Sequence, residues 1–258
     1  MSEGTKWREK LGEAVVIVAS ILLAFWIDAW WVGREEARNE RESLELVSRD
    51  LNAAIAQLTD FAEFAEQVGT EGLEAMEALS TGDVQEPHDL SRMIQRASDR
   101  KTVALPTAAY TDLVSTGTLR LVRNRDLRDA IVRFYESAEI AQRILEKNSS
   151  LFLDGHIYSF YADGLLIWRV DEPWGHREAQ VVATEKASSR LSEDFEYTPD
   201  YFWSLPTNSP EWHRLRSSLS VTAHTLFMGR EYALEVIEDA RTLDAEVRRE
   251  LEARGVVP

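Results

Sequence analysis

The chain has 258 residues, of which 44% are hydrophobic, so it can form one large or two small packed domains and is not disordered. Its 45 acidic and 29 basic residues give a formal net charge of -16. That charge argues against nucleic-acid binding and gives no sign of a polybasic lipid-binding face. The absence of cysteine excludes disulfides, thiolate metal sites and cysteine nucleophiles.

An apolar run at 11–32, LGEAVVIVASILLAFWIDAWWV, predicts a transmembrane helix that follows a short tail at 1–10. It carries no charge between Ala14 and Ile27, and its flanks extend it to the roughly 20 residues that a span needs. A cleaved signal peptide and a buried core helix fit less well, because no small-residue cleavage site follows and a charged helical pattern continues. Tryptophans favour the membrane interface, and they flank the run at Trp7, Trp26, Trp30 and Trp31.

Two carboxylates, Glu13 and Asp28, lie at the edges of the apolar run and are candidate contacts to another subunit. Glu13 has Lys10 one helical turn before it. Asp28 has no basic residue three or four positions away, so it is the better candidate. Solvation at the membrane interface is the alternative reading of Asp28.

The orientation of the span is weakly encoded, because basic residues on its two sides nearly balance and acidic residues count little. We expect the tail inside the cell and the domain at 33–258 outside it. The basic residues before the span are Lys6, Arg8 and Lys10, and those after it are Arg34, Arg38 and Arg41.

A long amphipathic helix is predicted directly after the span, so that the membrane helix continues into it. Apolar residues at Ile55, Ala62 and Phe64 widen its stripe, which favours an intramolecular bundle over a two-stranded coiled coil. The stripe itself recurs in steps of three and four residues at Leu44, Val47, Leu51, Ala54, Leu58, Phe61, Ala65 and Val68.

Further helices follow a break at 80–87. Two short helices are expected near 89–99 and 107–116, the second capped by Gly117. A second long helix begins after the N-cap Asn124, repeats its apolar spacing as far as Phe152 and ends by Gly164. A third opens at Ser209-Pro210-Glu211 and reaches at most Ala253. The predicted fold is all-α, an elongated antiparallel bundle continuous with the transmembrane helix.

The segment at 165–208 is rich in aromatic residues and proline and is predicted to be irregular. If the first long helix leaves the membrane and the second returns, this segment lies near the bilayer, where tryptophan and tyrosine are favoured. The alternative is a loop that packs its own side chains into the open end of the bundle. Its candidate partner contacts are Trp168, Trp174, Tyr201, Phe202 and Trp203.

Two stretches resemble an uncharacterised family of bacterial single-pass membrane proteins with a domain of unknown function. The sequence departs from the family at Phe25-Trp26 and in its less basic tail. The resemblance implies a membrane anchor with a helical domain and the tail inside the cell, and it brings no activity. The matching residues are Gly12-Glu13 and Ile27-Asp28-Ala29-Trp30, and then Tyr110, Leu113, Ser115, Gly117, Leu119, Asn124, Leu127, Arg128, Phe134 and Tyr135.

Catalytic motifs are absent from the sequence, and no cofactor or metal is expected. The five histidines have no metal-ligand spacing; His213 and His224, on one predicted helix, are about 16 Å apart along its axis. Basic residues from Arg92 to Lys101 form a stripe that is either a docking face for an acidic partner or a solvated surface.

These features predict a non-enzymatic protein of the bacterial inner membrane, a structural or accessory subunit in contact with the bilayer. It would pack on other membrane subunits or on copies of itself. The alternative is an extracytoplasmic helical sensor or relay module that works with a partner.

Overall fold

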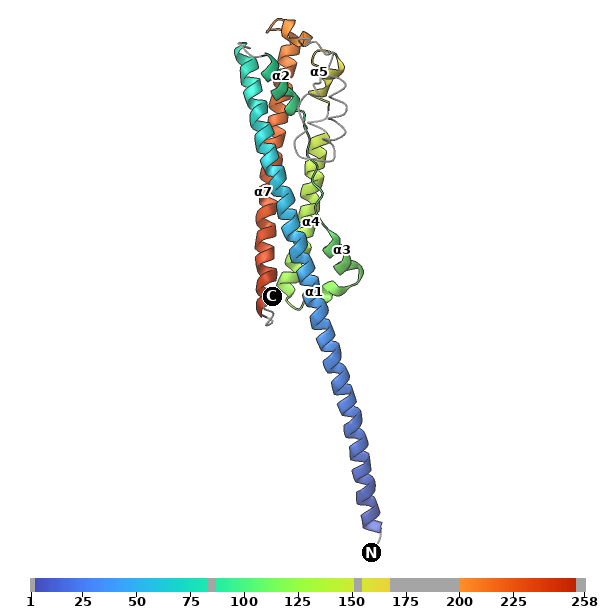
Figure 1. The fold of residues 1–258 in the computed structure, drawn as a ribbon. Coiled ribbons are helices and arrows are strands. Elements are labelled where there is room, and N and C mark those ends of the chain that lie inside the picture. Colours follow the sequence, from blue (N-terminus) through green and yellow to red (C-terminus); the bar gives the residue numbers. More distant parts are fainter. Residues whose placement is uncertain (1–2, 83–86, 151–154, 168–199, 254–258) are drawn as a thin grey trace, which may run out of the picture. The chain divides into compact units, whose positions relative to one another are not determined.

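The computed structural model describes residues 3–82, 87–150, 155–167 and 200–253, with side chains from Val18 onward and without that of His88. Its elements are all helical, and no strand occurs in these ranges, which confirms the all-α prediction (Figure 1). In chain order they are α1 (Glu3–Thr81), α2 (Pro87–Arg96), α3 (Ala108–Ser115), the 3-10 helix η1 (Thr118–Leu121), α4 (Arg125–Asn148), α5 (Tyr158–Ala162), the 3-10 helix η3 (Tyr201–Ser204) and α7 (Pro210–Ala253).

Helix α1 is unbroken over 79 residues, so the apolar run and the amphipathic stripe belong to one helix, as predicted. All eight predicted stripe residues, from Leu44 to Val68, are buried, with at most 7% of any of them exposed. The spacing of three and four residues therefore identified the packed face of α1 correctly.

The predicted helix ends are found at specific residues. Gly117 has a φ of 69° after α3, a left-handed conformation that glycine adopts without a steric cost. The Asn124 side chain accepts a hydrogen bond from the Leu127 backbone N–H (3.2 Å) at the start of α4. Ser209 accepts one from the Trp212 N–H (3.4 Å), with Pro210 as the first residue of α7. Helix α4 has 24 residues as far as Asn148, and residues 149–150 continue it as π-helix; Phe152, where the predicted spacing ended, lies outside the described residues.

The chain divides into two compact units that share the long helices. Unit 1 comprises Met1–Ala53, Pro106–Tyr135 and Ala240–Pro258, and unit 2 comprises Ala54–Leu105 and Glu136–Asp239. The buried apolar side chains of unit 1 come from α1, α3, α4 and α7 and from Val122, the residue after η1. They include Leu44, Val47, Leu51, Leu113, Leu127, Ile131, Leu243 and Val247.

In unit 1, α4 runs in the same direction as α1, which corrects the prediction of a purely antiparallel bundle. The Arg123 backbone N–H lies 2.6 Å from Glu40 Oε1, and ten residues further along α1, Asp50 contacts Tyr135. The two helices thus run in the same direction from this point. Directions of chain segments depend on how the intervening residues return, and amphipathic spacing carries no information about that return.

Unit 2 is built around aromatic and aliphatic side chains from α1, α2, α5, η3 and α7. The Phe202 ring stacks on Trp212 with centroids 5.2 Å apart, and the Phe160 ring meets Phe202 edge-on at 6.1 Å. Within the unit α1 and α7 are antiparallel: a Cβ on Gly69 would lie 3.1 Å from the Phe227 ring, and Arg230 pairs with Glu66. The absence of a side chain at Gly69 permits this close approach.

Candidate interaction surface

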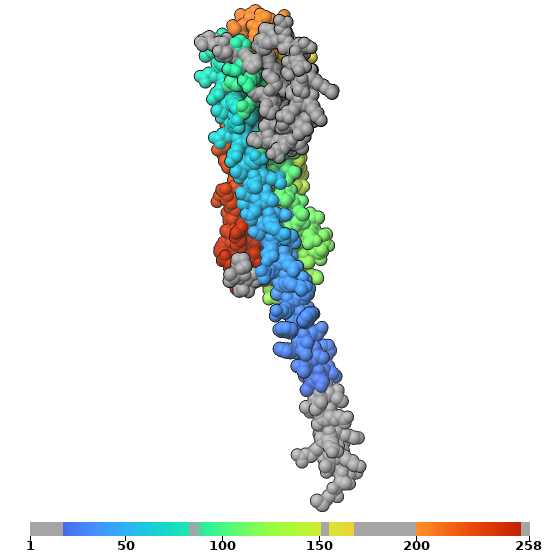
Figure 2. Space-filling model, viewed as in Figure 1, coloured from blue at the N-terminus to red at the C-terminus, as the bar shows by residue number. Residues whose placement is uncertain are grey.

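The apolar stretch of α1 at 18–32 is exposed on every side. Its ten large apolar side chains are each 47–67% exposed, and they point in all directions around the helix axis because consecutive residues are included, such as those at 21–23 and 25–27. Figure 2 shows this stretch in blue, and no other coloured segment covers it in that view. A helix that is apolar all round requires an apolar environment on all its faces.

The tryptophans and the carboxylate at the end of this stretch are exposed. Trp26, Trp30 and Trp31 are 66%, 52% and 63% exposed, and the Arg34 guanidinium lies 5.7 Å from the centre of the Trp30 ring. Asp28 is exposed and forms no hydrogen bond or ion pair with any residue of the described ranges. The side chains of Trp7 and Glu13 lie outside the described ones.

Among the residues whose side chains the structure describes, no helix has both the length and the hydropathy of a membrane span. That finding covers the predicted span only from Val18 onward, since the side chains at 11–17 are not described.

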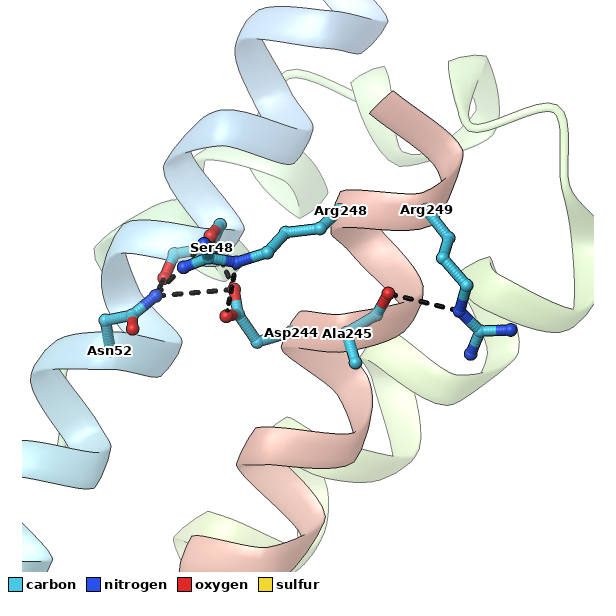
Figure 3. Close-up of polar contacts among 6 residues, drawn as sticks. All are labelled: Ser48, Asn52, Asp244, Ala245, Arg248 and Arg249. Atoms are coloured by element: carbon cyan, nitrogen blue, oxygen red, sulfur yellow. Dashed lines mark hydrogen bonds and ion pairs between the residues drawn. The ribbon is translucent and has the colours of Figure 1, made fainter. Parts of the chain in front are cut away.

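Asp244 is the centre of a polar cluster in unit 1 that joins α1 to α7 (Figure 3). The carboxylate is 8% exposed; it accepts hydrogen bonds from Ser48 Oγ (2.5 Å), Asn52 Nδ2 (3.3 Å) and Arg248 Nε (2.7 Å). Arg249, in the next position, points away, and its described hydrogen bond is to its own helix, at the Ala245 carbonyl. Both carboxylate oxygens of Asp244 accept hydrogen bonds, so the residue links the two helices. Its role in this cluster is structural.

A second polar link of unit 1 joins α1 to the start of α3. Asp50 Oδ2 accepts hydrogen bonds from the Ala109 backbone N–H (2.8 Å) and the Tyr135 hydroxyl (3.3 Å). Burial, and then the neighbouring Asp50 carboxylate, raise the pKa of Tyr135 above its ordinary value, so the phenol stays protonated and donates. Tyr110 stacks on Tyr135 with ring centroids 4.7 Å apart.

The aromatic segment divides at its described residues. Tyr201 is 62% exposed, whereas Phe202 is fully buried. Trp203 packs on the same core and donates its indole N–H to Ser91 Oγ (3.0 Å) and Asp200 Oδ2 (3.2 Å). Phe202 and Trp203 thus fit the alternative in which the segment packs its own side chains against the bundle. Trp168 and Trp174 lie outside the described residues.

The premise for placing this segment near the bilayer is not met in unit 1. It required the second long helix to run back toward the apolar run, but residues 125–135 of α4 follow α1 away from it. Of the five aromatic residues predicted as partner contacts, Tyr201 alone among those described is largely exposed.

Asp200 is a feature of unit 2 that the sequence did not indicate. This carboxylate, 2% exposed, accepts hydrogen bonds from the Ile167 backbone N–H (2.8 Å), the Ser91 hydroxyl and the Trp203 indole. The donors lie up to 109 residues away in the sequence, so no local pattern could reveal the site.

A cavity of about 180 Å³ opens in unit 2. Phe61, Phe64 and Leu145 line its apolar side, and Asp99 and Lys101 contribute charges. Burial raises the pKa of Asp99, an effect opposed by Arg96 and Arg100 and reinforced by Glu71. The predicted basic stripe is largely paired: Arg96 with Glu71 (3.0 Å) and Lys101 with Asp60 (2.5 Å).

Metal chemistry has no support in the described part of the chain, where no cluster of three or more His, Asp or Glu residues could hold an ion. His156, His213 and His224 are exposed, the His88 side chain is outside the described ones and His176 lies in the range 168–199.

No protein family model, curated protein or solved structure matches this chain.

Proposed function

We propose that the chain is a single-pass protein of the bacterial inner membrane and acts as a structural or accessory subunit, without enzymatic activity, of a larger membrane assembly. The apolar part of α1 would span the bilayer, and the helical units, on the extracytoplasmic side, would cover or bridge other subunits.

The observation that carries this proposal is the all-round exposure of the apolar residues at 18–32. One partner helix buries a stripe of a helix surface, but lipid surrounds it completely. Full burial of a large apolar side chain is worth about 1.5–3 kcal/mol, so ten such residues in water would be a large penalty. Together with the uncharged residues at 14–17, the stretch has the composition of a span flanked by interfacial tryptophans.

Asp28 supports the accessory role. A carboxylate near the end of a span is costly in lipid, and Asp28 has no partner within the described ranges. A donor on a neighbouring subunit would satisfy it. The bilayer interface is the competing environment, and the two alternatives differ in what happens to assembly when the charge is removed.

The test is purification of tagged full-length protein from its own membranes in mild detergent, followed by size measurement and mass spectrometry of what accompanies it. We expect a stoichiometric complex. Membranes washed with alkaline carbonate should retain the protein, and its release there would contradict the anchor itself. A lone monomer, inserted but unaccompanied, would contradict only the accessory role.

The charge at Asp28 is tested by Asp28→Asn, which keeps the shape of the side chain. We expect loss of the accompanying subunits with unchanged membrane insertion. Ala29→Ser is the matched control, because it changes the neighbouring position without removing a charge. Full recovery of the complex with Asp28→Asn would show that this carboxylate is merely solvated.

The alternative function, a sensor or relay module working with a partner, is favoured by the cavity of unit 2, which combines aromatic walls with charged residues. A small ligand bound there would raise the melting temperature of the full-length protein in detergent, by an amount that grows with ligand concentration. Ser150→Trp, which would place a large side chain at the exposed rim of the cavity, should remove that response. Lack of stabilisation across a broad screen of small ligands would count against this alternative.

A further inference from the structure

The segment between α3 and α4 gathers positive charge in a protein whose net charge is -16. Residues 117–128 contain four arginines and one acidic residue, Asp126. Arg123 and Arg125 have acidic neighbours, Glu40 and Asp129, each 3.9 Å away. Among the described residues Arg120 and Arg128 form no ion pair. Composition alone could not reveal this surface, because the acidic residues elsewhere in the chain outweigh it.

The same two arginines border an apolar hollow. It is shallow and wide open to solvent, and it is lined by Leu113, Val114, Gly117 and Leu119 together with Arg120 and Arg128. Val114 is 53% exposed although it is apolar. The hollow thus combines an apolar floor with guanidinium groups at its edge, which suits a molecule with an anionic head and an acyl chain.

The position of this segment along α1 brings it close to the proposed bilayer. Within unit 1 the Arg123 backbone N–H bonds Glu40, which is eight residues, or about 12 Å, beyond Val32 at the end of the apolar run. Figure 1 shows α3 and the chain after it beside this part of α1. The polar headgroup layer, about 5–8 Å deep, and a long arginine side chain together cover that distance, which is the level of Arg123. Arg128 lies about 8 Å farther along, because α4 runs in the same direction as α1, so only a lipid phosphate drawn up into the hollow reaches it.

We infer that the hollow between α3 and α4 is a binding site for an anionic phospholipid of the bilayer that holds α1, with Arg120 and Arg128 contacting its phosphate. This inference rests on the proposed membrane anchor and adds a specific lipid contact to it. The contact would fix unit 1 against the membrane surface at a second point, beside the helix that anchors it.

Because the chain has no cysteine, a single fluorescent label can report this contact in the full-length protein. Ser115→Cys places the label at the exposed end of α3, next to the hollow. The protein is placed in nanodiscs of phosphatidylcholine in which either brominated phosphatidylglycerol or brominated phosphatidylcholine quenches the label. We expect stronger quenching by the anionic lipid at equal mole fraction. A label at exposed Ala53→Cys, about 30 Å beyond Val32 along α1, should be quenched by neither.

The double variant Arg120→Gln/Arg128→Gln should remove the preference for the anionic lipid. An arginine near an anionic surface contributes about fivefold, or about 1 kcal/mol, so the loss for two should be an order of magnitude or more. Arg49→Gln/Arg133→Gln is the matched control: it removes the same charge from unit 1 at exposed positions outside the hollow. Circular dichroism of both variants checks that the helices are intact.

The outcomes separate the inference from the proposed function. Equal quenching by both lipids, or equal loss of preference in the two double variants, would overturn the lipid site while the anchor stands. Failure of the unlabelled protein to enter nanodiscs or to resist carbonate extraction would overturn the anchor itself, and the lipid site with it.

Discussion

In unit 1 the segments that meet are mostly long helices. In unit 2 a segment with little helix of its own packs against the helices of that same unit. Unit 1 joins its helices through an aliphatic stripe and places carboxylates at the contacts, such as Asp50 and Asp244. Unit 2 holds the residues around η3 by burying aromatic rings, and it uses one carboxylate, Asp200, to bond the backbone and side chains of that segment. Helices satisfy their own backbone groups, but an irregular segment needs partners from outside.

This difference predicts that the stability of unit 2 depends chiefly on its aromatic core. Phe202→Ala should lower the free energy of unfolding by about 3–5 kcal/mol, because it empties a fully buried ring position between Phe160 and Trp212. Denaturant unfolding of the full-length protein in mild detergent measures the effect. The adjacent Tyr201→Ala, which removes an exposed ring, should change it by less than about 0.5 kcal/mol. Similar losses for the two variants would show that the ring core does not hold this segment.

Asp200→Asn tests the polar part of unit 2. The amide keeps one acceptor oxygen for three donors, so at least one buried donor loses its partner at a cost of about 2–3 kcal/mol. Hydrogen exchange at the Ile167 amide should accelerate as well. Asp163→Asn is the control, because it removes an exposed carboxylate whose ion pair, with Arg214, is on the surface. Unchanged exchange at Ile167 would mean that Asp200 is not what holds this backbone.

Unit 1 should be less sensitive to the loss of one polar contact, because its helices remain hydrogen-bonded internally. Asp244→Ala should cost about 1–2 kcal/mol, leaving Ser48 and Asn52 without their shared acceptor. Arg249→Ala, one position after Arg248 and outside the cluster, is the control and should have little effect (Figure 3). A loss as large as that of Phe202→Ala would remove the contrast between the two units.

The smallest expected effect is a gain in stability, and it depends on pH. Burial raises the pKa of Asp99 in the folded state. The contribution of this group to the free energy of unfolding is therefore fully present below the unfolded pKa of about 3.9, and it is lost as pH rises through the folded pKa. The ionised carboxylate is therefore a net cost at neutral pH. Asp99→Asn should raise the free energy of unfolding at pH 7, by about 0.5 kcal/mol, and the gain should vanish below about pH 4. A gain that persists at acidic pH would point to a cause other than ionisation.

The sequence predicted those parts of the fold that depend on local pattern. The buried stripe of α1, the glycine after α3, the asparagine before α4 and the Ser-Pro start of α7 each follow from residues within a few positions of one another. The prediction of the direction of α4 was wrong, because that direction depends on how the chain returns through residues 97–107. That stretch carries no apolar periodicity that would reveal its path.

In the candidate sites, too, the features that depend on residues distant in the sequence could not be predicted. The exposure of Trp26, Trp30 and Trp31 followed from the apolar run, but the burial of Phe202 did not, since nothing local separates it from exposed Tyr201. Asp244 resembles a solvated acid with Arg248 one turn later, and its bond to Ser48 crosses 196 residues. The hollow beside Arg120 and Arg128 exists only once α3 turns at Gly117.

The unbroken course of α1 from the apolar run to the packed helices of unit 1 sets a rotational phase as well as a distance. Each residue of a helix turns the chain by about 100° and advances it by about 1.5 Å. Under the proposed anchor, the number of residues between Val32 and Leu44 would therefore set the face that the packed helices of unit 1 present to a neighbour in the membrane. One inserted residue would swing that face through more than a quarter turn. Seven would return it almost to its starting azimuth, about 10 Å farther from the apolar run.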